Sequence, residues 1–284
     1  RPELSAACQA SDRAFAVPRI DSDEYLTAIH DLAVENDVAL IIPTLDTELL
    51  ALSAVREEWL SEGIFVSVPD KRLVAQCRDK RLTVELFASL DVPTPQLIHD
   101  EETFPRFVKP VGGSLSQDIH IVDNADAYPA RLADRSLFVH QEVVNTSAYQ
   151  EFTVDVYFDN HGALKCLVPR RRLEVRGGEI SKGRTEKGPF MDFLVDRLAV
   201  LTGARGCMTA QFFVPRHWEN PLTPVLGVEV NPRFGGGYPL TDHVGGRYVE
   251  WLMDEVLFGT VPAYTDAWRD GVTMLRYDAE IFLP

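Results

Sequence analysis

The chain has 284 residues, 45% of them hydrophobic and 25% charged, the balance of a soluble globular protein with room for two or three packed subdomains. Its formal net charge of −15 argues against nucleic acid and anionic membranes as main partners, because both bind clustered positive charge. No apolar run is long enough to cross a bilayer and no basic-then-apolar leader opens the sequence, so we expect a cytoplasmic protein. The sequence begins at Arg1 rather than at Met, which leaves room for an upstream segment.

The first 70 residues alternate between helical and extended patterns. Apolar residues recur at helical spacing from Asp23 to Glu35, and a continuous apolar run at 38–42 ends at Pro43, as in a buried parallel strand. A second helix is expected from Glu48 to Glu58 and a second short strand from Ile64 to Val68. This alternation predicts an open α/β sheet.

A domain boundary is expected shortly after residue 90. Asp70 is a good helix N-cap, and the helix that it begins is predicted to run to Leu90, before Pro93 and Pro95 forbid its continuation. We therefore divide the chain into 1–92 (an α/β domain with a linker helix), 93–145 (a small lobe) and 146–284 (a C-terminal lobe).

Strands and Gly-rich turns dominate the rest of the sequence. Alternating residues from Phe152 to Phe158 predict a strand with one face in the core. Other expected strands are Phe107–Pro110, Ile119–Val122, and the pair Cys207–Val214 and Pro224–Asn231; helices are expected around Phe190–Leu201 and Val249–Val256.

The strongest chemical signal is the strand that ends at Asn231. Side chains alternate along a strand, so Leu226, Val228 and Val230 should face one side while Glu229 and Asn231 face the other. Two oxygen ligands two residues apart on one face can share a hard cation such as Mg²⁺.

The sequence on either side of this strand adds further residues to the predicted cation site. If the preceding strand pairs antiparallel with it, Gln211 lies beside Glu229 and adds a third oxygen-bearing side chain. Pro232 ends the strand, so Arg233 emerges at its tip, and Gly235–Gly237 allow the backbone to approach a ligand closely. An ordinary sheet with polar residues in solvent would explain Glu229 or Gln211 alone, but not the whole string.

Basic residues give weaker signals in this acidic chain. Lys109 at a strand end, followed by Gly112-Gly113-Ser114, is suited to phosphate, although a plain β-hairpin looks the same and no Walker A motif is present. The densest basic run, Arg170–Arg172, fits an anion site and a solvated strand end equally well. Lys80, Gln141–Val144 and Glu151, each taken alone, fit a structural role better than a functional one.

The cysteines and histidines form no familiar metal or redox motif. No two of the four cysteines have zinc-site spacing, and no HExxH pattern occurs. We expect each cysteine to fill a small buried space in a reducing compartment.

Taken in chain order, these segments resemble the ATP-grasp superfamily, and more closely the carbamoyl-phosphate-synthase-like branch of carboxylate–amine ligases. The resemblance extends from Asp70 to Met253, and it is specific in the order and spacing of the motifs. The matching segments are Cys77-Arg78-Asp79-Lys80, Phe107-Val108-Lys109-Pro110, Gln141-Glu142, Glu151-Phe152-Thr153-Val154-Asp155-Val156, Ala210-Gln211-Phe212 and Glu229-Val230-Asn231-Pro232-Arg233. The segment 42–48 looks like the pre-ATP-grasp domain of that family.

The resemblance implies a truncated pre-ATP-grasp parallel sheet followed by a two-lobed ATP-grasp fold, with ATP and Mg²⁺ (or Mn²⁺) as cofactors. It implies that ATP phosphates are bound by Lys80, Lys109, Gly113 and Ser114, adenine by Gln141, Glu142 and Val144, and ribose by Glu151. It implies that the metal is held by Gln211, Glu229 and Asn231, and that Arg233, with Asn231 as a further catalytic residue, steadies the transferring phosphoryl group or the acyl phosphate. Arg170 and Arg172 are expected to face the substrate. The Ser181–Thr185 stretch is expected to be a loop over the substrate. The phosphate loop departs from the family pattern in lacking a lysine and a second glycine cluster, and the opening Gly-rich strand is not in this sequence.

The implied reaction is the conversion of a carboxylate to an acyl phosphate and its transfer to an amine, with an amino acid as one substrate and ADP and phosphate as products. Two alternatives stay open: an enzyme that phosphorylates carbamate or bicarbonate, and a catalytically silent ATP-binding regulatory module. A homodimer is the default expectation for the assembly.

Overall fold

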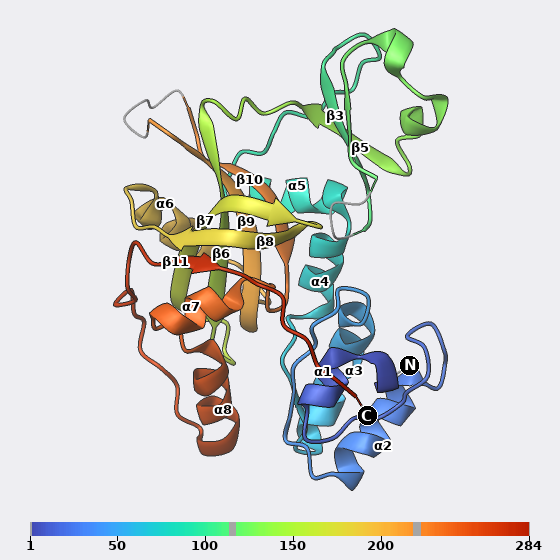
Figure 1. Ribbon diagram of the computed structural model, residues 1–284, viewed down its shortest axis with the longest axis vertical. Helices are drawn as coiled ribbons and strands as arrows, with labels where there is room; N and C mark the ends of the chain where they lie inside the picture. The colour runs from blue at the N-terminus through green and yellow to red at the C-terminus, as the bar shows by residue number, and fades with distance from the viewer. Residues whose placement is uncertain (1, 114–117, 218–222, 284) are drawn as a thin grey trace.

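The computed structural model describes residues 2–113, 118–217 and 223–283, which form three sheets (Figure 1). A two-stranded parallel sheet lies near the N-terminus, a three-stranded antiparallel sheet follows it, and a six-stranded antiparallel sheet belongs to the C-terminal half. In Figure 1 the three-stranded sheet stands apart from the six-stranded sheet, at the opposite end of the molecule from the N-terminal helices. No helix within these ranges is both long and apolar enough to span a bilayer.

The N-terminal part confirms the predicted alternation of helices and parallel strands, although the strands are shorter than expected. Leu40 pairs with Phe65 and Ile41 with Val66, and the helices bury Ala33, Leu49 and Trp59 against them. Its elements are a 3₁₀ turn (Pro2–Leu4), α1 (Ala6–Ala10), α2 (Tyr25–Glu35), β1 (Leu40–Ile41), α3 (Leu49–Ser61) and β2 (Phe65–Val66).

The prediction of a single helix from Asp70 to Leu90 is wrong, because the helix breaks at Asp79. Asp70 caps α4 (Lys71–Arg78) as expected, accepting a hydrogen bond from a backbone N–H of the first turn. Asp79 has extended backbone angles (φ −95°, ψ 115°), and its carboxylate caps a second helix, α5 (Lys80–Ser89). The break places Lys80 at a helix N-terminus instead of on the side of a continuous helix.

The three-stranded sheet has the order β4-β3-β5, with β3 in the centre. Val108 and Phe138 pack on Leu132 to form its own small core. Its elements are β3 (Arg106–Pro110), β4 (His120–Val122), two 3₁₀ turns (Ala125–Ala127 and Ala130–Ala133) and β5 (Phe138–Glu142).

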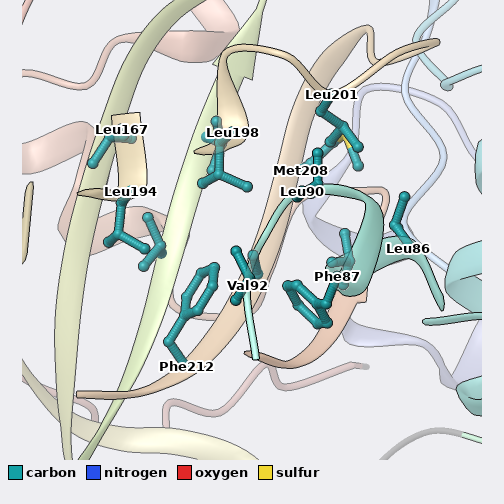
Figure 2. Packing of buried hydrophobic residues seen from close by; sticks show 14 of the residues in the cluster. Leu86, Phe87, Leu90, Val92, Leu167, Leu194, Leu198, Leu201, Met208 and Phe212 are labelled. Carbon is teal, nitrogen blue, oxygen red and sulfur yellow. The ribbon is translucent and has the colours of Figure 1, made fainter. Parts of the chain in front are cut away.

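The six-stranded sheet has helices on both faces. Leu86 and Phe87 of α5 pack with Leu194 of α6 on one face, where Phe87 meets Phe212 edge-on (Figure 2). α7 and α8 cover the other face (Figure 1). In sheet order the strands are β10 (Leu226–Asn231), β9 (Gly206–Pro215), β6 (Tyr149–Phe158), β7 (Leu164–Arg176), β8 (Glu179–Thr185) and β11 (Thr273–Leu275); the helices are α6 (Phe190–Leu198), α7 (Tyr238–Val244) and α8 (Tyr248–Phe258).

Two sequence predictions about this sheet need correction. β6 buries both faces, not one: Thr153, Asp155 and Tyr157 are as inaccessible as the apolar residues between them, because α7 and α8 cover that side. In β10 the pairing register shifts between Gly227 and Glu229, and this irregularity puts Val228 on the same cavity wall as Glu229.

Candidate functional site

A cavity of about 580 Å³ lies between the three-stranded and the six-stranded sheets. Every site residue predicted from the sequence lines it, except Ser114, which lies outside the described residues. Five basic and four acidic residues of the described chain line this cavity. In a protein of net charge −15, such a gathering of cations marks a site for an anionic ligand.

Gln211 and Glu229 are direct cross-strand partners, as the sequence predicted. Asn231 Nδ2 donates to Glu229 Oε1 at 3.1 Å, so the amide turns its N–H toward the carboxylate and keeps Oδ1 as an acceptor. One carboxylate and two amide oxygens therefore meet at the β9–β10 edge of the cavity. This donor set fits Mg²⁺, which typically takes one or two carboxylates and completes its shell with water and phosphate oxygens.

Two lysines face this cluster from the three-stranded sheet and the start of α5. Burial lowers the pKa of Lys109 to about 8, an effect that the negative charge of Glu229 opposes and the positive charge of Lys80 reinforces. Burial also lowers the pKa of Lys80, and Glu229 again opposes it. Lys80 is held at both ends: its N–H donates to Val111 O at 2.9 Å and its Nζ to Gly113 O at 3.0 Å.

Strand alternation divides the Arg170–Arg172 run. Arg170 and Arg172 line the cavity, whereas Arg171 lies 3.4 Å from Glu186 in an ion pair outside it. Arg172 Nε is 3.0 Å from Glu151 Oε1, in an ion pair whose geometry is not that of a hydrogen bond. Burial raises the pKa of Glu151, while Arg172 opposes that effect.

Arg170 belongs to a buried polar network centred on Asp155. Arg170 Nε and Nη2 donate to the two carboxylate oxygens of Asp155 at 2.9 and 2.7 Å, and both side chains are at most 1% exposed. The hydroxyls of Thr209 and Thr241 donate to the same carboxylate. Arg170 Nη1 has no hydrogen-bond partner among the described residues.

The cavity lining also includes the apolar residues Phe107, Ile121 and Phe213. Gln141 Nε2 donates to Pro95 O at 3.1 Å, and Glu142 Oε1 accepts from the Gln96 N–H at 2.9 Å. The side chains of Gln141 and Glu142, both predicted for the adenine site, are thus hydrogen-bonded to the backbone of Pro95 and Gln96. Val144, the third member of that prediction, lies on the cavity wall.

Arg233 at the end of β10 forms an ion pair with Asp46 of the N-terminal part. Arg233 Nε and Nη2 each lie 2.7 Å from a carboxylate oxygen of Asp46, and Nη1 donates to Phe234 O. Burial lowers the pKa of Arg233, but the combined effect of Asp46, Glu179 and Glu229 raises it above its ordinary value. A guanidinium has five N–H donors, so two remain for a ligand.

The three glycines after Arg233 serve close side-chain packing. A Cβ atom added at Gly235, Gly236 or Gly237 would lie 2.9, 2.0 or 1.8 Å from Thr209, Glu179 and Arg170, respectively. The sequence argument invoked the approach of a ligand to this backbone. The three glycines line the cavity, so that expectation stays a prediction, and polar side chains of β7, β8 and β9 also rest on this backbone.

Comparisons with known proteins agree with this architecture. Residues 1–67 match the family described as the PylC-like N-terminal domain. A search of the curated proteins finds no match to this sequence.

Three solved structures illustrate the likeness. The biotin carboxylase domain of Hydrogenobacter thermophilus 2-oxoglutarate carboxylase, complexed with MgADP and bicarbonate, has a TM-score of 0.72 and 18% identity, over 95% of this chain and 65% of that one. N5-carboxyaminoimidazole synthetase from Staphylococcus aureus, with ADP, has a TM-score of 0.62 and 14% identity over 82% and 63% of the two chains. L-amino acid ligase from Bacillus licheniformis has a TM-score of 0.64 and 14% identity over 87% and 63%.

The chain has an ATP-grasp fold. It spans 65% of the length of the Hydrogenobacter thermophilus chain, so it corresponds to part of that protein. In this ATP-grasp fold the cavity lies between the two antiparallel sheets, with the predicted metal ligands on one wall and the predicted phosphate lysines on the other.

Sequence reasoning missed three residues of the ATP-grasp cavity region and misassigned one segment. Asp155 was expected only as part of the polar face of a strand, and Asp46 only as part of the segment 42–48. Glu179, the first residue of β8, gave no signal in the sequence. Ser181–Thr185 is not a loop, because it pairs with β7 as part of β8.

Proposed function

We propose that this protein is a ligase that uses Mg²⁺-ATP to phosphorylate a carboxylate and passes the acyl group to an amine, releasing ADP and phosphate. The observation that carries the proposal is the meeting of Lys80 and Lys109 with the Glu229 oxygen cluster in one cavity. ATP binding is further supported by the Hydrogenobacter thermophilus and Staphylococcus aureus structures, which hold ADP.

The charges suit phosphoryl transfer. The γ-phosphoryl group spreads negative charge over its oxygens during transfer, and stabilising that charge is the main task of the protein. In this proposal Glu229, Asn231 and Gln211 would hold Mg²⁺, and the ion would supply positive charge that neutralises phosphate oxygens. Lys80 and Lys109 bind phosphate from the opposite wall, and Arg233 offers its two remaining N–H groups to the carboxylate substrate.

Phosphorylation addresses the chemical difficulty of the reaction. A carboxylate is a poor electrophile because it would have to expel oxide, whereas an acyl phosphate expels phosphate. The activated group must be kept from water until the amine attacks, and a position deep in the cavity between the two sheets favours this shielding. We assign ribose to Glu151, which lies beside Arg172, and adenine to the apolar lining that includes Phe213.

A second candidate is phosphorylation of bicarbonate, which the Hydrogenobacter thermophilus structure contains. It would use the same ATP and Mg²⁺ sites. The two candidates differ in the group that receives the phosphoryl group, so one experiment can separate them.

The test is an ADP-release assay with Mg²⁺-ATP, run against pooled amino acids with amine acceptors, small carboxylates, and bicarbonate. Substrate carboxylate labelled with ¹⁸O should transfer one labelled oxygen to the released phosphate, the signature of an acyl phosphate. Glu229→Ala should abolish release, whereas Glu174→Ala, on an exposed ion pair with Lys182, should not. Formation of AMP and pyrophosphate would refute the proposal, and label transfer from bicarbonate alone would select the second candidate.

A further inference from the structure

Glu179 is a carboxylate in the cavity that has no assigned role. It is the first residue of β8, it lines the cavity, and its Oε2 rests against the backbone of Gly236. Within the described chain its carboxylate forms no hydrogen bond and no ion pair shorter than 4 Å. A partly buried carboxylate without a partner is costly, so this position needs a reason.

The other three carboxylates of the cavity wall all have partners. Glu142 accepts the Gln96 N–H, Glu151 lies against Arg172, and Glu229 accepts from Asn231. Glu179 is thus the one acidic side chain of the described cavity wall that has neither a hydrogen bond nor an ion pair to another residue.

Three arginines lie around Glu179 without forming an ion pair with it: Arg233, Arg170 and Arg276, the last of which donates to Gly236 O. Arg233 is close enough for the charge of Glu179 to raise its pKa, yet its guanidinium is paired with Asp46. Arg170 Nη1 rests on Gly237, the next residue after Gly236, and has no partner among the described residues. A negative and a positive group therefore lie over consecutive glycines, each with unused hydrogen-bonding capacity.

We propose that Glu179 binds the protonated amino group of the carboxylate substrate, which makes that substrate an amino acid. The inference rests on the ligase function proposed above and deepens it. The ammonium group donates to the Glu179 carboxylate beside Gly236, while the substrate carboxylate faces Arg233 and the terminal phosphate. Two-point recognition of opposite charges fixes the orientation of an amino acid.

The same carboxylate disfavours bicarbonate and plain carboxylic acids. Neither carries a cationic group, so each would bring a second negative charge toward Glu179 and leave it unpaired. An amino acid compensates the Glu179 charge and makes the site electrically complementary. The proposal therefore predicts selection for the amino group itself, whatever the side chain.

The experiment compares L-amino acids with their desamino counterparts, in which hydrogen replaces the amino group. Thermal unfolding midpoints are measured with and without Mg²⁺-ADP, and KM and kcat are measured by ADP release. At least one amino-acid pool should raise the midpoint, and its desamino counterpart should not. Glu179→Gln should raise KM for the amino acid by about 10- to 100-fold, the scale of a lost charge-assisted hydrogen bond, and leave the shift caused by Mg²⁺-ADP unchanged.

Two further variants separate recognition from folding. Glu179→Asp keeps the charge and should restore part of the affinity, while Glu174→Gln, on the same hairpin but outside the cavity, should behave as the wild type. Desamino acids that bind as tightly as amino acids, or an unchanged KM in Glu179→Gln, would overturn the proposal. If Mg²⁺-ADP did not raise the thermal unfolding midpoint, the ligase function would be contradicted instead. The comparison of amino acids with desamino acids in the absence of nucleotide would still test the role of Glu179.

Discussion

Asp46 and Arg233 lie 187 residues apart in the sequence and meet in a two-pronged ion pair, with two contacts of 2.7 Å. The pair joins the N-terminal part to the end of β10, directly after the proposed metal ligands. It also fixes the plane of the guanidinium, because both Nε and Nη2 are engaged by one carboxylate. The N–H groups that remain for a ligand are thereby held in a set direction.

Replacing Asp46 with Ala should reduce both stability and activity. Both side chains are at most 14% exposed, so the change leaves a largely buried cation without its partner. We expect a loss of about 2 kcal/mol in the free energy of unfolding, below the range for fully buried pairs. Urea denaturation measures it, and Asp21→Ala, in an exposed pair with Arg19, is the matched control that should show no measurable change. An equal free energy of unfolding for Asp46→Ala and the wild type would show that the ion pair does not stabilise the fold.

The pKa of Lys109, about 8, predicts opposite pH dependences for stability and for ATP affinity. Above pH 8 the folded protein loses this proton while the unfolded chain, with a lysine pKa of about 10.4, still keeps it. Unfolding then takes up a proton, so the free energy of unfolding of the ligand-free protein should rise between pH 8 and about 10.4.

ATP affinity should fall over the same range, because a neutral amine attracts phosphate less strongly. Both trends should be weaker in Lys109→Met, which keeps the volume but not the charge. Parallel titrations of urea stability and ATP dissociation constant provide the test. A wild-type profile identical to that of Lys109→Met would mean that Lys109 does not titrate there.

Glu229→Gln should weaken metal use more than nucleotide recognition. The variant keeps the shape of the side chain but removes the one carboxylate of the proposed ligand set, which also contains Gln211 and Asn231. We expect the Mg²⁺ concentration for half-maximal activity to rise by at least about 10-fold, the scale of losing a charged ligand interaction. Activity measured against Mg²⁺ and against Mn²⁺ at fixed ATP tests this. An unchanged requirement for metal would place the ion elsewhere.

Gly237→Ala should destabilise the fold through Arg170. A Cβ atom at this position would lie 1.8 Å from Arg170 Nη1, and Arg170 cannot move freely because Asp155 holds it by two hydrogen bonds. We expect a loss of about 1–3 kcal/mol, as for other overpacked sites. Gly112→Ala is the control for stability, since an added Cβ there meets nothing within 4 Å. Thermal unfolding of the two variants should differ clearly, and equal midpoints would contradict the packing argument.

The sequence predicted the parts of the site that depend on strand periodicity. Placing Glu229 beside Gln211 needed nothing but alternation and antiparallel pairing, and the structure has that register. The same reasoning failed at Val228, which lines the cavity together with Glu229 where the pairing register shifts. A bulge leaves no reliable mark in a sequence of apolar and polar residues.

Tertiary contacts account for the other errors. Asp79 belongs to a segment with helical composition, and its extended backbone places the next residue, Lys80, in contact with Val111, 31 positions farther on. The pairing of Asp46 with Arg233 likewise depends on how separate units dock. The domain boundaries at 92/93 and 145/146, the homodimer and the individual site roles stay predictions.

The attachment of Lys80 has a consequence for how the cavity can open. Helix α5 is anchored through Leu86 and Phe87 in the core beneath the six-stranded sheet, while its first residue is bonded to Val111 and Gly113 just past β3. A rotation of the small sheet about this attachment would have its pivot at Lys80. Points near a pivot travel least, so the two phosphate lysines would keep their spacing in an open and in a closed cavity. A nucleotide could then be held by its phosphates before the far wall closes on its base.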